Sequence, residues 1–121
     1  MEYNLNKEAN KMKHLLFVVL DNKKETHDLI HKLSELGFNG TVLSSTSLKH
    51  VIHDEEEDTP SFFSLAHLSE NKFVHNTTIY FILEDAELKE VQETIREFTK
   101  QFTLVKGGMF ATPIESYEGS F

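Results

Sequence analysis

Hydroxyl and amide side chains gather at two places that flank one long segment of the chain. Ser44, Ser45 and Thr46 close a β-branched stretch, and Asn76 and Thr77 open the next apolar stretch. Such groups hydrogen-bond to phosphate oxygens and to the polar edges of bases. If the two stretches are neighbouring strands, these side chains meet and form a site for a small ligand. The same residue types also end strands and cap turns, so that alternative stays open.

A second candidate patch is Lys106-Gly107-Gly108. Glycine lets the backbone approach an anion closely, and the lysine adds a positive charge. A pair of glycines also marks a bend or bulge in a strand, which is the structural alternative. The predicted ligand-binding residues are Asn39, Thr41, Ser44, Ser45, Thr46, Asn76, Thr77, Lys106 and Gly107.

Histidines supply a possible metal site. His27 and His31 are four residues apart on a predicted helix and share a face, a spacing that can bind zinc. His50 and His53 precede the acidic run 54–58. We expect no metal, because histidines off the buried stripe of a helix or in a loop are usually solvated. The alternative is that these four histidines bind a metal ion.

Composition argues against several function classes. The chain has no cysteine, which removes thiolate nucleophiles and Cys-based metal sites. It contains no Gly-x-Ser-x-Gly or Walker-type motif, so we expect a protein that is not an enzyme. The formal net charge is -8 and Arg96 is the single arginine, which argues against nucleic-acid binding through phosphates.

The start of the sequence has no feature of a targeting signal. Residues 1–13 are polar and mixed in charge, and we predict a flexible leader there. The longest apolar run, Leu15 to Leu20, is far too short to span a bilayer. Together with the absence of cysteine, this predicts a cytoplasmic protein with no membrane span.

Three apolar stretches predict strands, at 14–20, 38–46 and 77–83. A final strand is predicted at 102–105, at 109–111, or at both around a bend.

Two stripes of apolar residues at spacings of three and four predict helices. The first helix is capped by Asn22, with Glu25 three residues later as in a capping box, and it ends at Gly37. The second is capped by Asp85 and runs to about Lys100.

The resulting order is β-α-β-β-α-β, which predicts an α+β, ferredoxin-like sandwich with a four-stranded antiparallel sheet and two helices on one face. The domain is expected at 14–112, with a long insert at 47–75 and a tail at 113–121. The first and third strands are apolar on both faces, so the face without helices needs a partner. We therefore predict a closed homo-oligomer.

This order, with its long insert, resembles the PII-like signalling proteins, whose corresponding insert is called the T-loop. The stretch 41–46 looks like the second strand of PII-like receptors for cyclic di-AMP, and Asn-Thr-Thr at 76–78 looks like the opening of their third strand. The chain departs from the receptors at 47–50, where they carry glycines and an aromatic residue. It departs from nucleotide-binding PII proteins at 84–86, where a Gly-rich basic loop is missing, so ATP binding in the usual PII manner is not expected.

The resemblance implies a homotrimer with ligand clefts between subunits, a nucleotide ligand such as cyclic di-AMP, and a protein effector that reads residues 47–75. Two alternatives stay open. The CutA-type trimers have a similar shape, and the histidines would then bind a divalent metal. A pure interaction module would bind no small ligand and would use the acidic run 54–58 or the apolar residues at 62–65.

Overall fold

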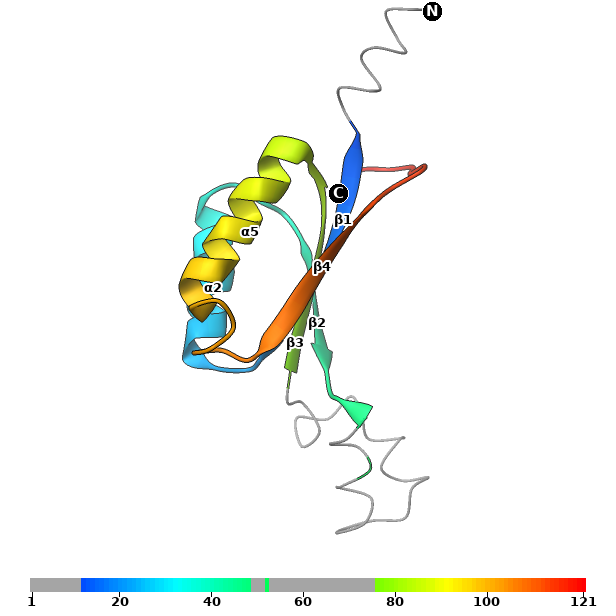
Figure 1. The fold of residues 1–121 in the computed structure, drawn as a ribbon. Coiled ribbons are helices and arrows are strands. Elements are labelled where there is room, and N and C mark those ends of the chain that lie inside the picture. Colours follow the sequence, from blue (N-terminus) through cyan, green and yellow to red (C-terminus); the bar gives the residue numbers. More distant parts are fainter. Residues whose placement is uncertain (1–11, 49–51, 53–75) are drawn as a thin grey trace, which may run out of the picture.

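The computed structural model describes residues 12–48, 52 and 76–121 (Figure 1). Its elements are β1 (Lys13–Asp21), α2 (Lys24–Glu35), β2 (Thr41–Ser45), β3 (Asn76–Glu84), α5 (Asp85–Thr99) and β4 (Gly107–Pro113). The predicted β-α-β-β-α-β order is confirmed. Most of the predicted insert 47–75 lies outside the described residues, and so do the predicted leader up to residue 11, His50 and His53.

The four strands form one sheet in the order β2-β3-β1-β4, and every neighbouring pair is antiparallel. Both helices lie on the same side of this sheet (Figure 1). The prediction of a ferredoxin-like α+β sandwich is therefore confirmed. In this order β2 and β4 are the edge strands, and the two strands that are apolar on both faces are central.

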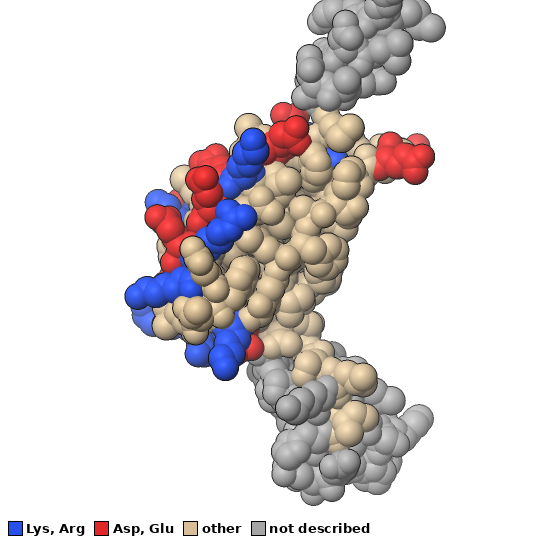
Figure 2. Space-filling model, viewed as in Figure 1, with Lys and Arg blue, Asp and Glu red and all other residues tan. Residues whose placement is uncertain are grey.

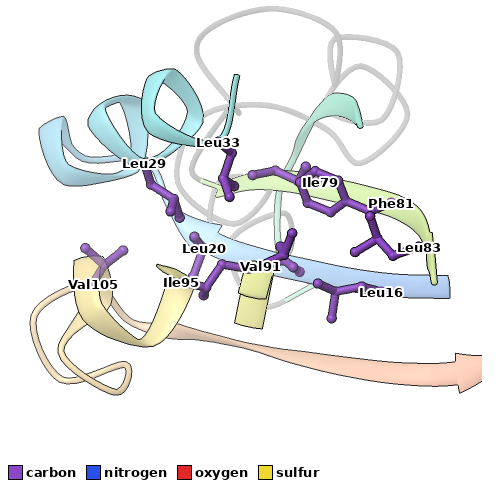
Figure 3. Close-up of a cluster of buried hydrophobic side chains, with 11 residues drawn as sticks. Leu16, Leu20, Leu29, Leu33, Ile79, Phe81, Leu83, Val91, Ile95 and Val105 are labelled. Atoms are coloured by element: carbon purple, nitrogen blue, oxygen red, sulfur yellow. The ribbon is translucent and has the colours of Figure 1, made fainter. Parts of the chain in front are cut away.

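The core lies between the sheet and the helices, and it follows the two periodicities in the sequence. Alternate residues of β1 and β3 point into it, and the helices add residues at spacings of three and four (Figure 3). The buried apolar residues are Leu16, Val18, Leu20, Leu29, Leu33, Ile79, Phe81, Leu83, Val91, Ile95 and Val105.

The N-cap of each helix is one residue away from the predicted cap. Lys23, not Asn22, is the N-cap of α2, and its amide donates to Thr26 Oγ1 (3.4 Å). Glu84, not Asp85, is the N-cap of α5, and its amide donates to Glu87 Oε1 (3.0 Å). In each case a side chain at the third helical position satisfies the backbone of the cap residue, which is one half of a capping box.

The predicted strand at 102–105 is wrong, and the alternative around 109–111 is confirmed as β4. Residues 100–102 all have left-handed backbone, with φ of 49°, 53° and 62°. Thr99 holds this turn, because its Oγ1 donates to the Ile95 carbonyl (2.8 Å) and accepts from the Phe102 amide (3.1 Å). The turn reverses the chain after α5, so that Val105 of the expected strand is buried in the core and Phe102 packs against it, partly buried.

The sheet face away from the helices is apolar, and we call it the open face. Directly paired residues share a face, so Phe17 and Phe110 lie together there, with ring centroids 5.2 Å apart. Phe110 is 58% exposed, and Leu43 on the same face is 49% exposed. Figure 2 shows charged side chains gathered over the helices and few over the strands. The second apolar face expected from the sequence is therefore present.

Among the residues that the structure describes, none of the helices has the length and apolar character needed to cross a membrane.

Candidate functional site

The two hydroxyl and amide patches predicted from the sequence are neighbours in the sheet. Ser44 lies opposite Thr77, and Ser45 lies opposite Asn76, in the antiparallel pairing of β2 with β3. Both pairs sit at the end of the sheet where the chain enters and leaves the long insert. The prediction that strands two and three bring these residues together is confirmed.

The same row continues across the sheet to the lysine patch. Asn76 lies opposite Asp21 of β1, and the Asp21 amide donates to the Lys106 carbonyl (2.9 Å). Ser45 of β2, Asn76 of β3 and Asp21 of β1 thus form one row with Lys106, the residue that precedes β4, and we call it the sheet-end row. It combines a hydroxyl, an amide, a carboxylate and an ammonium group.

The hydroxyls of Thr78 and Thr46 lie beside this row, and both are buried. Ser45 Oγ lies 2.7 Å from Thr78 Oγ1, and Thr78 is only 5% exposed. Thr46 Oγ1 is buried, and none of the described residues hydrogen-bonds to it. Because a buried hydroxyl without a partner is costly, this end of the sheet has a hydrogen-bonding group that a ligand could satisfy.

Ser45→Ala is expected to lower the free energy of unfolding by about 1–2 kcal/mol, because it leaves the buried Thr78 hydroxyl without its partner. Ser44→Ala, at an exposed neighbouring position, is the control and should change stability by less than about 0.5 kcal/mol. Urea unfolding checks both. Adding Thr78→Val to Ser45→Ala should restore part of the loss, and a further loss of the same size would contradict this role of the pair.

Gly107, a predicted ligand-binding residue, has a clear structural role. Its φ is +148°, and a Cβ atom there would lie 2.0 Å from the Val19 carbonyl oxygen. Glycine is therefore required for β4 to pair closely with β1. The ligand prediction for Gly107 is untested, and the strand-bend alternative accounts for this residue.

Asn39 and Thr41, also predicted to bind ligand, lie away from the sheet-end row. Thr41 and Ser45 stand at opposite ends of β2, about 13 Å apart at the usual rise of a strand. Asn39 and Thr41 instead line a separate cavity of about 140 Å³ together with Phe121. The structure thus divides the predicted ligand set between two places.

Asp21 and Thr78 belong to this end of the sheet, and the predicted set of ligand-binding residues did not include them. Asp21 ends the first apolar run, and Thr78 stands next to the predicted Thr77. Only the register, which places Asp21 opposite Asn76 and Ser45 diagonal to Thr78, shows that they belong together.

The histidines that the structure describes do not form a metal site. His27 and His31 are exposed on α2, and no group of three or more His, Asp or Glu residues suited to a metal occurs among the described residues. His14 instead lies beside an acid, with Nδ1 3.1 Å from Asp85 Oδ1.

Comparison with known proteins gives a result for the fold alone. No family model matches the sequence, and no curated protein matches it either. Among solved structures, a functionally unknown protein from Pediococcus pentosaceus is 15% identical with a TM-score of 0.58, over 91% of this chain and 99% of that one. Arabidopsis thaliana PII bound to citrate is 14% identical with a TM-score of 0.53, over 86% and 78% of the two chains.

B. subtilis GlnK is 12% identical with a TM-score of 0.47, over 86% of both chains. The strand order, the two helices on one face and the similarity to Arabidopsis PII agree with the resemblance found in the sequence. The fold of this chain is therefore similar to that of Arabidopsis PII.

Proposed function

We propose that this protein is a PII-like sensor that binds a nucleotide-type ligand at the sheet-end row and passes the signal on through residues 47–75. The observation that carries the proposal is the convergence of Ser45, Asn76, Asp21 and Lys106 on one end of the sheet. Beside them lies the buried Thr46 hydroxyl, to which none of the described residues hydrogen-bonds. Three of these residues come from separate strands and the fourth precedes β4, and the insert starts and ends beside them.

The mixture of charges favours a nucleotide over a simple anion. Lys106 and the hydroxyl and amide groups suit phosphate oxygens, whereas the Asp21 carboxylate repels them. Asp21 can accept hydrogen bonds from the amino group of a base or from a ribose hydroxyl. A ligand that carries both a phosphate and an amino or hydroxyl donor can hydrogen-bond to every side chain of the sheet-end row. Cyclic di-AMP is a ligand of this class.

Assembly and signalling complete the proposal. The open face is large and apolar, so copies of the chain would pack through it, as a homotrimer on the PII pattern. The sheet-end row would then lie where subunits meet. A ligand that makes different contacts with two states of the insert would shift the equilibrium between those states. A protein effector would bind one of the two states and so detect the ligand. A protein of this fold, Arabidopsis PII, has been solved with the small ligand citrate.

Thermal melting of chelator-treated protein tests the ligand. The panel contains cyclic di-AMP, cyclic di-GMP, ATP, AMP, citrate and zinc. A ligand that binds only the folded state stabilises it by about 2.7 kcal/mol at a hundredfold excess over Kd. For a domain of this size, that should raise the Tm by roughly 10 °C. We expect this shift with one nucleotide, and a shift with zinc alone would overturn the nucleotide proposal.

A pure interaction module is the second candidate, and the exposed apolar residues of the open face favour it. It predicts no shift with any member of the panel. The metal-binding alternative has no support among the described residues, although its His50 and His53 lie outside them.

A further inference from the structure

The segment after β4 turns back toward the sheet and reaches strands that it does not pair with. The Ile114 amide donates to the Lys13 carbonyl (2.9 Å), which fixes the start of the segment beside β1. Ser120 and Phe121 then line the 140 Å³ cavity with Thr41 of β2 and with β3. Since β1 lies between β4 and β3, the segment crosses β1 on its way (Figure 1).

The surface that this segment reaches belongs to the open face. Tyr80 and Ile82 line the cavity, and they alternate along β3 with Ile79 and Phe81, which point into the core. Neither α2 nor α5 lies on this side of the sheet (Figure 1). Tyr80 and Ile82 are nevertheless half-buried, whereas Phe110 on the same face is 58% exposed. Because Ser120 and Phe121 line the same cavity as these two residues, the returning segment covers this part of the face.

The segment has internal features that hold it in a bent shape. Gly119 has a φ of +95°, a left-handed conformation that glycine adopts without steric cost and that redirects the chain. The rings of Tyr117 and Phe121 meet edge to face, with centroids 6.4 Å apart. The bend brings Phe121 to the sheet.

We propose that residues 115–121 form a strap that covers part of the open face within one chain and competes with a second copy of the chain for that face. Two groups cannot cover the same Tyr80 and Ile82 surface, so a packing partner must displace the strap. The strap therefore weakens self-association and sets the concentration at which copies assemble. This inference rests on the assembly part of the proposed function.

The first test compares substitutions at two exposed phenylalanines. Phe121→Ser removes the ring of the strap from the sheet and should tighten self-association at least fivefold, measured by sedimentation velocity over a dilution series. Phe110→Ser, on the open face outside the strap, should weaken it. Weaker or unchanged association of Phe121→Ser would overturn the competition, because the ring would then serve the contact between copies or be irrelevant to it.

The second test fixes the strap in place. The chain has no cysteine, so Thr41→Cys with Ser120→Cys provides a unique pair of thiols in the wall of one cavity. Joining them with a short thiol cross-linker should give mostly intramolecular product and should reduce self-association. Thr41→Cys alone, treated with a monofunctional reagent, is the control. Cross-linked protein that associates as tightly as the control would contradict the strap.

The two tests separate this inference from the proposed function. If the wild-type chain and Phe121→Ser both stay monomeric, competition between strap and copy is overturned, and so is the assembly part of the proposed function. Nucleotide binding in the melting panel would still stand. If the wild type assembles and Phe121→Ser assembles equally well, only the strap is overturned.

Discussion

Gly107→Ala is expected to lower the free energy of unfolding by about 3 kcal/mol or more, and to lower the Tm by roughly 12 °C. A Cβ atom at this position would lie 2.0 Å from the Val19 carbonyl oxygen and 2.9 Å from Leu20 Cα. Both are backbone atoms of β1, so the strand itself would have to move. The positive φ of Gly107 adds a conformational penalty to the steric one.

Gly108→Ala is the matched control, because a Cβ atom on this neighbouring glycine would meet no atom within 4 Å. We expect it to change stability by less than about 0.5 kcal/mol in either direction. Chemical unfolding followed by circular dichroism measures both variants. Equal stability of the two would contradict the close approach of β4 to β1.

Phe110→Asp is expected to weaken self-association at least about a hundredfold, which corresponds to about 2.7 kcal/mol. The Phe110 ring stacks on Phe17 on the open face and is 58% exposed in the single chain. A carboxylate there would be removed from water when copies pack together, without a partner of opposite charge. Because Phe110 is exposed in the single chain, Phe110→Asp should still fold.

Leu36→Asp is the control for this effect. Leu36 is 41% exposed and follows α2, on the helix side of the molecule rather than on the open face. Light scattering coupled to size-exclusion chromatography gives the mass of each variant at matched concentrations. If both variants assemble as the wild type does, the open face is not the surface through which copies meet.

Much of the fold can be predicted from the sequence because its signals are local and repeated. The alternation in 14–20 and 77–83 and the stripes of the two helices each involve several residues, so the core follows from them. Caps and turns depend on single hydrogen bonds. Nothing in the stretch 102–105 shows that Thr99 holds three left-handed residues ahead of it, and its apolar character favoured a strand.

The sequence predicts the part of the candidate site that flanks the long insert. Ser45 and Asn76 flank one insert, so an antiparallel pairing of their strands brings them together. Asp21 joins them through the β1–β3 register, which the sequence does not reveal. Thr41 lies only four residues before Ser45, yet the rise of the strand separates them, and the cavity beside Thr41 is completed by Phe121 from the other end of the chain.

The central claim, that a nucleotide binds at the sheet-end row, is tested most directly by isothermal titration calorimetry with cyclic di-AMP on the wild type and on Lys106→Ala. Because the Lys106 side chain is exposed, Lys106→Ala should have the same Tm as the wild type. Lys89→Ala on α5 removes the same charge elsewhere and serves as the control. The account predicts binding to the wild type and to Lys89→Ala, and at least tenfold weaker binding to Lys106→Ala. Equal binding to all three proteins, or none to the wild type with this or any other nucleotide of the panel, would contradict it.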